Sequence, residues 1–338
     1  MSPHTLSSAS APRPSSGVQI PNQAILVNPV VSQRADPSVY RHTDGYYYLT
    51  DSVPAYDLIE LRRARTLQGL SSATPVVVHR VAGSGPQSGW IWAPDIRFYD
   101  GTWYIYYSAS PSTNRFDHRL YSISNTSANP LTGSWTHNGQ LMTDWESFTI
   151  DATSFTSNGR RYLVWAQKDP AIPGNSNIYI ARLTSPTKIT GRQVRLSAPT
   201  YAWESTGQTV NEAPAVQQRN GKIFLTYSAS ATDSTYKMGL LSASASADIL
   251  NPAAWRKSAQ PVFQTSAQNR VYGPGSNSFT VSDDGKDVVN VYNARSYPDP
   301  TPDPLRDPNR SIRMQKVNWK PDGTPDFGVP AATGPTLE

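Results

Sequence analysis

The feature that most constrains the fold of this 338-residue chain is a motif that recurs five times. Each copy has a short polar or acidic start, an apolar run, a glycine turn and an aromatic-rich run. The copies are DPSVYRHTDGYYYLT (36–50), APDIRFYDGTWYIYYSAS (93–110), DATSFTSNGRRYLVWAQ (151–167), EAPAVQQRNGKIFLTYSAS (212–230) and SNSFTVSDDGKDVVNVYNA (276–294). Their turn glycines lie 56 to 64 residues apart, at Gly45, Gly101, Gly159, Gly221 and Gly285.

Each copy predicts a β-hairpin, because Asp-Gly and Asn-Gly pairs between strand-like runs favour tight turns that need a positive φ. A third strand-like run follows each hairpin, and a fourth follows several of them. The third runs are LIELRRA (58–64), RLYSI (119–123), NIYIA (177–181), MGLLS (238–242) and IRMQKV (312–317). Four strands per unit in five units predict an all-β chain that folds as a five-bladed β-propeller. A β-sandwich would show no period of this length.

The ends of the chain carry little further information. We expect residues 1–20 to form a flexible leader, because positions 2–17 read SPHTLSSASAPRPSSG and are rich in Ser and Pro. Residues 21–338 are then one propeller domain. No signal peptide is visible, and no apolar run approaches the roughly 20 residues of a membrane-spanning helix. We therefore expect no membrane contact, and secretion is expected from function alone.

Charge and composition narrow the choice of partners. The formal net charge is +5, but the basic residues are scattered, so we expect a solvated surface and no nucleic-acid partner. The chain has no cysteine, and hence neither a disulfide framework nor a thiolate metal site. Its five histidines lack metal-ligand spacing, and no calcium-binding loop is present. A monomer without a catalytic metal is expected.

Three acidic residues stand at the starts of repeat copies. Blades pack radially, so the first strand of each blade should line a central channel, and equivalent starts should converge on the axis. With a one-residue gap in the second copy, these starts are Asp36, Ala93, Asp151, Glu212 and Ser276. Carboxyl groups that converge raise one another's pKa, and such clusters bind a cation or carry out acid–base chemistry. The alternative for each acid alone is a turn cap or a pair with an arginine.

Glycoside hydrolysis fits these acids best. It uses one carboxyl group to protonate the leaving oxygen and another to activate water, and the nine Trp and eighteen Tyr supply flat surfaces for sugar rings. No nucleophile elbow and no phosphate-binding loop are present. The rival class is a non-catalytic propeller that binds a protein or a glycan. WD-repeat propellers of that class have a shorter period and a Trp-Asp signature, and this chain has no Trp-Asp pair.

With these residues placed, the sequence resembles glycoside hydrolase family 43. The motifs that carry the resemblance are ADPSVYRHTDGYYYLT around Asp36, WAPDI at 92–96, the Asp151 segment ending in RYLVWA, NEAPAV with GKIFLTYS around Glu212, and RMQKVNWKPDGTPDFG at 313–328. Within the family, the chain most resembles exo-1,5-α-L-arabinofuranosidases. The resemblance implies an inverting hydrolase of plant cell-wall arabinan or arabinoxylan on a five-bladed propeller. A β-xylosidase or an endo-arabinanase remains an alternative.

The resemblance also implies roles for individual residues. Asp36 would be the general base, Glu212 the general acid, and Asp151 the residue that orients Glu212 and keeps its pKa high. Apart from the resemblance, Trp92 stands beside the channel position of the second blade, and we expect it to stack on a sugar, with a core Trp between blades as the alternative. Arg295 would bond sugar hydroxyls, with a surface ion pair as the alternative.

One position departs from the family pattern. Many members carry a histidine after the GPG of the fifth blade, often beside a central calcium. Here GPG (273–275) is followed by Ser276. This departure argues against an axial calcium, and we expect no required cofactor. A structural ion on the axis is still compatible with the sequence, and sodium, chloride or water are the candidates.

Overall fold

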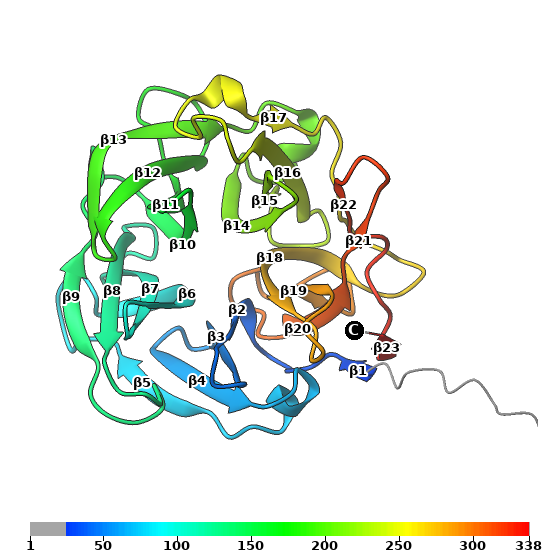
Figure 1. Cartoon of the computed structure of the whole chain (residues 1–338), viewed down its shortest axis with the longest axis horizontal. Coiled ribbons are helices and arrows are strands. Elements are labelled where there is room, and N and C mark those ends of the chain that lie inside the picture. The colour runs from blue at the N-terminus through cyan, green and yellow to red at the C-terminus, as the bar shows by residue number, and fades with distance from the viewer. Residues whose placement is uncertain (1–24, 338) are drawn as a thin grey trace, which may run out of the picture.

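The computed structural model of the chain describes residues 25–337. Five antiparallel sheets of three or four strands are arranged around a central channel, and two further pairs of short strands lie outside them (Figure 1). The five-bladed, all-β propeller expected from the repeat is thus confirmed. The expected leader at residues 1–20 lies outside the described residues.

The five blades follow one another along the chain. Blade one is β2 (Ala35–Arg41), β3 (Tyr47–Ser52), β4 (Leu58–Ala64) and β5 (Val76–Arg80). Blade two is β6 (Gly89–Tyr99), β7 (Thr102–Ser110), β8 (Arg119–Asn125) and β9 (Thr136–Gln140). Blade three is β10 (Thr149–Ser157), β11 (Arg160–Gln167), β12 (Asn177–Ser185) and β13 (Lys188–Ser197). Blade four is β14 (Asn211–Arg219), β15 (Lys222–Ala229), β16 (Lys237–Ser244) and β17 (Arg256–Lys257). Blade five is β18 (Tyr272–Val281), β19 (Val288–Arg295) and β20 (Ser311–Lys316).

The remaining elements are short. They are β1 (Ile25–Asn28), β21 (Asn318–Trp319), β22 (Pro325–Asp326) and β23 (Gly334–Leu337), with the 3-10 helices η1 (Gln68–Ser71), η2 (Ala202–Glu204) and η3 (Pro252–Ala254). Among residues 25–337, no helix has the length and apolar character needed to cross a membrane.

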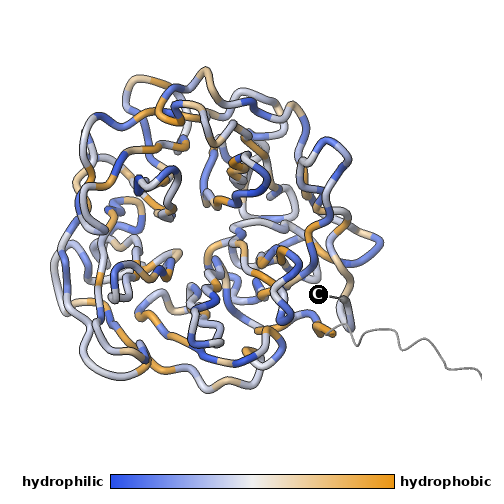
Figure 2. The backbone as a smooth tube through the Cα atoms, viewed as in Figure 1, coloured by the Kyte–Doolittle hydropathy of each residue, from blue (hydrophilic) through white to orange (hydrophobic). Residues whose placement is uncertain are grey.

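The first hairpin of every blade turns at the glycine that the repeat marks. All five turn glycines have φ between 70° and 83°, a backbone region that other residues adopt only at a cost. The first strands β2, β6, β10, β14 and β18 lie innermost (Figure 1) and line the channel. Hydrophobic segments occur in all five blades and are interrupted by hydrophilic turns (Figure 2).

Large aromatic side chains join neighbouring blades. Tyr48 of blade one and Trp103 of blade two are both fully buried, with ring centroids 4.6 Å apart. Tyr106 of blade two packs in one cluster with Trp165 of blade three. Burying such rings is the main source of stability in this kind of core. The blades are therefore held by apolar contacts at their interfaces.

Blade five is completed by the beginning of the described chain. The side chain of Asn28 donates to the Met314 carbonyl and accepts from the Met314 amide, both at 2.8 Å. Val30 donates to the Ile312 carbonyl, and Ile312 donates to the Val31 carbonyl. Strand β1 also pairs with β23 beside this blade (Figure 1). Residues near both ends of the described chain therefore close the ring.

Each innermost strand contains a bulge that carries one residue with a positive φ. These residues are Asp36 (50°), Ala93 (44°), Asp151 (60°), Ala213 (48°) and Ser276 (47°). The pairing registers shift at the same point in all five blades. The fourth equivalent residue is therefore Ala213, and the alignment that put Glu212 there is wrong by one position. The prolines that follow three of these residues, Pro37, Pro94 and Pro214, carry the correct alignment.

Candidate active site

A pocket of about 580 Å³ opens at one end of the channel, and all three predicted acids line it. Asp36 and Asp151 occupy the bulges of β2 and β10, whereas Glu212 lies one residue before the bulge of β14. Glu212 in blade four is therefore structurally equivalent to Trp92 in blade two. Each is the last paired residue before the bulge of its innermost strand. The structure therefore brings the acids together, although not from identical positions.

The bulges are fixed by side chains of the preceding blade. The amide of Asp36 donates to Oδ1 of Asn293 at 2.8 Å, and that of Ser276 donates to Oγ of Ser228 at 2.8 Å. Backbone strain at a positive φ persists only where neighbouring groups hold it. These bonds therefore keep Asp36 at the mouth of the channel.

Asp36 forms an ion pair with Arg310. Nη1 of Arg310 lies 3.3 Å from Oδ1 of Asp36, and Nη2 donates to the Tyr56 hydroxyl at 3.0 Å. The Tyr56 hydroxyl in turn donates to the Leu305 carbonyl. Burial works against the positive charge of Arg310, but Asp36 and nearby groups raise the pKa of this guanidinium above its usual value. A lasting positive charge therefore stands beside Asp36.

Glu212 has a different surrounding. Burial raises the pKa of Glu212 to about 7, and the charge of Asp36 adds to the rise. The Tyr236 hydroxyl donates to Oε1 of Glu212 at 2.8 Å. This bond stabilises the carboxylate and therefore lowers the pKa of Glu212, against the effect of burial. Glu212 therefore keeps a substantial protonated population near neutral pH.

Asp151 is the third member of the group. Its Oδ2 accepts a bond from the Ala213 amide at 2.9 Å. Burial, followed by the charges of Glu212 and Asp36, raises the pKa of Asp151 well above its usual value. Because the repulsion between Asp151 and Glu212 is mutual, this pair releases its last proton at a higher pH than either acid alone.

Trp92 lies in the wall of the pocket and is 8% exposed. Its ring stacks on that of His118, with centroids 4.0 Å apart and planes at 25°. His118 is fully buried, and burial lowers its pKa to about 4, so the imidazole is neutral at ordinary pH. Trp92 therefore belongs both to the core between blades and to the pocket. Its contact with a sugar stays a prediction.

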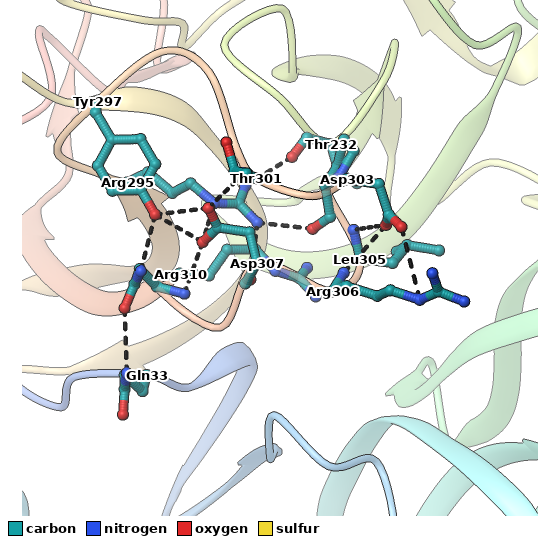
Figure 3. A network of polar contacts seen from close by, with 12 residues as sticks. Gln33, Thr232, Arg295, Tyr297, Thr301, Asp303, Leu305, Arg306, Asp307 and Arg310 are labelled. Atoms are coloured by element: carbon teal, nitrogen blue, oxygen red, sulfur yellow. Dashed lines mark hydrogen bonds and ion pairs between the residues drawn. The ribbon is translucent and has the colours of Figure 1, made fainter.

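Arg295 does not line the pocket. The side chains of Arg295 and Asp307 are 4% and 3% exposed and form an ion pair at 3.3 Å (Figure 3). The alternative of a surface ion pair is therefore wrong, because this pair is buried. The expected bond from Arg295 to sugar hydroxyls stays a prediction that this position does not favour.

Arg310 and Tyr236, which contact Asp36 and Glu212, were not predicted from the sequence. Arg310 directly precedes β20, three residues before the recognised segment at 313–328, and Tyr236 directly precedes β16. Neither lies in a repeat motif. The sequence carries no signal that either would face an acid, since Arg310 and Asp36 are 274 positions apart.

A second cavity of about 360 Å³ lies further along the innermost strands and shares Asp36, Asp151 and Ser276 with the pocket. Among residues 25–337, no three His, Asp or Glu side chains are grouped so as to hold a metal ion. The structural ion expected on the axis beside Ser276 stays a prediction.

Comparison with known proteins places this geometry in a family. The sequence pattern of the family described as "Glycosyl hydrolases family 43" matches residues 26–325. An extracellular exo-α-(1→5)-L-arabinofuranosidase of Streptomyces avermitilis is 53% identical over 92% of this chain and 65% of its own length. The α-L-arabinofuranosidase 43 of Humicola insolens is 52% identical over 92% of this chain and 64% of its own. The chain thus spans slightly less than two thirds of each of these relatives.

A solved structure is similar over almost all of both chains. The crystal structure of an α-L-arabinofuranosidase from Lactobacillus brevis superimposes with a TM-score of 0.89 and 49% identity, covering 91% of this chain and 98% of that one. Almost all of that chain is therefore matched by the propeller described above.

Proposed function

This chain belongs to glycosyl hydrolases family 43, and on that basis we propose that it removes terminal L-arabinofuranose from α-1,5-linked arabinan or arabino-oligosaccharides. The proposed reaction is a single displacement with inversion at the anomeric carbon. The names of the Streptomyces and Humicola relatives support the sugar and the linkage. The word "extracellular" in the Streptomyces name supports secretion. Arabinan or arabinoxylan of the plant cell wall is then the partner, and we propose that the protein acts as a monomer.

The observation that carries the proposal is the contrast between two carboxyl groups in one pocket. Asp36 is paired with the Arg310 guanidinium, which suits a carboxylate that accepts a proton. Burial raises the pKa of Glu212 to about 7, which suits a group that donates one. Environments that separate an acid from a base in this way are what glycoside hydrolysis requires.

The proton movements follow from this contrast. Asp36 accepts a proton from a water molecule as the water oxygen bonds to the anomeric carbon. Glu212 gives its proton to the glycosidic oxygen as the bond from that carbon to the leaving group breaks. One proton is taken and one is given, so the two carboxyl groups exchange protonation states and are reset by solvent.

Asp151 acts on Glu212 in two ways in this proposal. Its bond to the Ala213 amide fixes the residue next to Glu212. The two carboxylates repel each other when both are ionised, so the pair keeps a proton available for Glu212 to a higher pH than Glu212 alone would. Asp151 is therefore a positioning residue, whereas Asp36 and Glu212 are the catalytic residues. The wall formed by Trp92, Phe116 and Phe148 supplies aromatic faces for the sugar.

The test is release of arabinose from linear α-1,5-arabinan and arabinotriose, measured by chromatography. We expect the wild type to release the monosaccharide, and Asp36→Asn and Glu212→Gln to lose at least about 100-fold in kcat. Release of longer products would indicate endo action. Equal activity in all three proteins would refute the catalytic assignment, and no activity in the wild type would refute the proposed function.

A second substrate separates the base from the acid. A 4-nitrophenyl arabinofuranoside has a leaving group that needs little protonation. Glu212→Gln should therefore retain far more activity on this substrate than on arabinotriose, whereas Asp36→Asn should be impaired on both. Proton NMR of the first product formed should show the β anomer, which is the stereochemistry of inversion.

A further inference from the structure

The segment 296–310, which joins β19 to β20, forms one side of the pocket. It contains five prolines in fifteen residues. Proline has no amide hydrogen to give to a sheet, and the segment has no regular strand or helix. Asp303, Pro304, Leu305 and Arg310 of this segment line the pocket. Its course must therefore be set by side chains.

The carboxylate of Asp307 binds residues of the segment on both sides of it in the sequence. Asp307 is buried, and its oxygens accept bonds from the Tyr297 hydroxyl at 2.7 Å and from the Thr301 amide at 2.9 Å (Figure 3). Oδ1 of Asp307 also accepts a bond from the Asn309 amide at 2.9 Å. Since Asn309 directly precedes Arg310, Asp307 fixes the backbone from which the Arg310 side chain leaves.

The Arg295 guanidinium anchors this carboxylate to the propeller. Besides its ion pair with Asp307, Arg295 donates to the Pro304 carbonyl at 2.7 Å and to the Thr232 carbonyl at 2.8 Å (Figure 3). Pro304 belongs to the pocket-lining part of the segment, and Thr232 lines the pocket from blade four. The pair therefore connects the segment with the end of β19 and with the neighbouring blade.

We propose that the Arg295–Asp307 ion pair is a positioning device for the hydrolysis, which sets the Arg310 guanidinium against Asp36. This inference rests on the proposed function. Neither Arg295 nor Asp307 lines the pocket, so both act through Arg310 rather than on the substrate. A displacement of about 1 Å in such a group is enough to cost about 100-fold in rate.

A double-mutant cycle between Asp307 and Arg310 tests this route. Asp307→Asn keeps the size of the side chain but removes its charge, and Arg310→Ala removes the group that it is proposed to position. We expect Asp307→Asn to lower kcat/KM on arabinotriose by about 10- to 100-fold. In the Arg310→Ala background, the same substitution should change kcat/KM by less than about threefold, because coupled residues are not additive.

Asp44 provides a matched control. Its carboxylate also accepts bonds from a tyrosine hydroxyl, that of Tyr48 at 2.6 Å, and from an amide, that of Tyr46 at 2.9 Å, and it faces Arg63 at 3.6 Å. It lies in the turn after β2, at the opposite end of this strand from Asp36. Asp44→Asn should therefore leave kcat/KM within about twofold of the wild type.

Arg295→Lys keeps the buried positive charge but not the forked geometry. It serves as a milder variant if Asp307→Asn does not fold, with folding checked by circular dichroism at the assay temperature. We expect it to lower kcat/KM and to show the same non-additivity with Arg310→Ala. If the wild type is active but the effects of the two single substitutions multiply in both cycles, the positioning role is refuted while the proposed function stands. An inactive wild type would instead contradict the proposed function.

Discussion

Oδ2 of Asp151 accepts the backbone amide hydrogen of Ala213 at 2.9 Å. The amides of Ala93, Ser276 and Asp36, which occupy the same bulge in other blades, bond to Ser52, Ser228 and Asn293 of their preceding blades. In blade three, the strand position of those acceptors holds Ala166, which has no acceptor atom in its side chain. Asp151 takes over the bond and thereby places its carboxyl group beside Glu212.

Asp151→Asn should separate the charge of Asp151 from its hydrogen bond. The asparagine oxygen can still accept the Ala213 amide, but it does not repel the charge of Glu212. Without this coupling, Glu212 should lose its proton near its own pKa of about 7, and activity should fall there as the pH rises. The wild type should stay active to a higher pH, because burial and neighbouring charges raise the pKa of Asp151 well above its usual value.

The measurement is kcat/KM on arabinotriose between pH 4 and pH 9, with an expected loss of about 10- to 100-fold at neutral pH. A basic limb at the same pH in both proteins would refute the role of Asp151 as a charge that acts on Glu212.

Tyr236→Phe should shift the same limb in the opposite direction. The Tyr236 hydroxyl donates to Glu212 and favours its ionised form, so its removal should raise the pKa of Glu212 further. Activity should therefore persist to a higher pH than in the wild type. Tyr106→Phe is the control, because it removes a hydroxyl that bonds to the Pro186 carbonyl at 2.7 Å and does not line the pocket, so it should leave the pH profile unchanged.

Glu212→Gln should stabilise the protein at alkaline pH. Burial raises the pKa of Glu212 from 4.5 to about 7 on folding. Folding free energy that depends on its protonated form is therefore fully present below about pH 4.5 and is lost as the pH rises toward about 7 and above. Glutamine has no such loss.

Urea unfolding should thus show Glu212→Gln more stable than the wild type by about 1–3 kcal/mol at pH 8, and of similar stability at pH 4. A stability difference that is the same at both pH values would mean that the desolvated charge of Glu212 is not its cause.

Asn28→Ala tests how the ring is closed. Asn28 is 1% exposed, and its side chain supplies both a donor and an acceptor to the Met314 backbone. Its loss leaves two buried backbone groups unpaired, which should lower the free energy of unfolding by about 2–4 kcal/mol. Asn138→Ala, in which the lost side chain bonds Ser122 and Ser124 at the exposed edge of blade two, should cost less than about 1 kcal/mol. Equal costs would show that the two closing bonds have no special part in stability.

The residues of the candidate site that lie within the repeat copies could be predicted from the sequence. Asp36 and Asp151 lie at equivalent points of repeat copies, so their convergence follows from the radial order of the blades. Glu212 was predicted as the start of the fourth repeat copy, although the structural equivalent is Ala213. The misalignment had little consequence, because Glu212, one residue before the bulge, also lines the pocket.

The sequence did not predict which arginine, Arg295 or Arg310, contacts Asp36. Arg295 directly precedes the irregular segment 296–310 and Arg310 is its last residue, and nothing in the local pattern indicates which of the two reaches Asp36. In the structure, Arg295 forms a buried ion pair with Asp307, and Arg310 forms an ion pair with Asp36. The choice depends on the course of a proline-rich segment, which is fixed by bonds between side chains rather than by a strand period.

The sequence by itself determined the five-bladed fold and the two bulge acids, because hairpin turns and strand periods are local properties that a repeat displays five times. Only the tertiary structure decided the chemical environment of those acids. The Arg310 charge beside Asp36 and the Tyr236 hydroxyl on Glu212 come from segments outside the repeat motifs, and burial in the assembled pocket raises the pKa of Glu212. Such contacts arise when the closed ring brings distant segments together, and no local pattern records them.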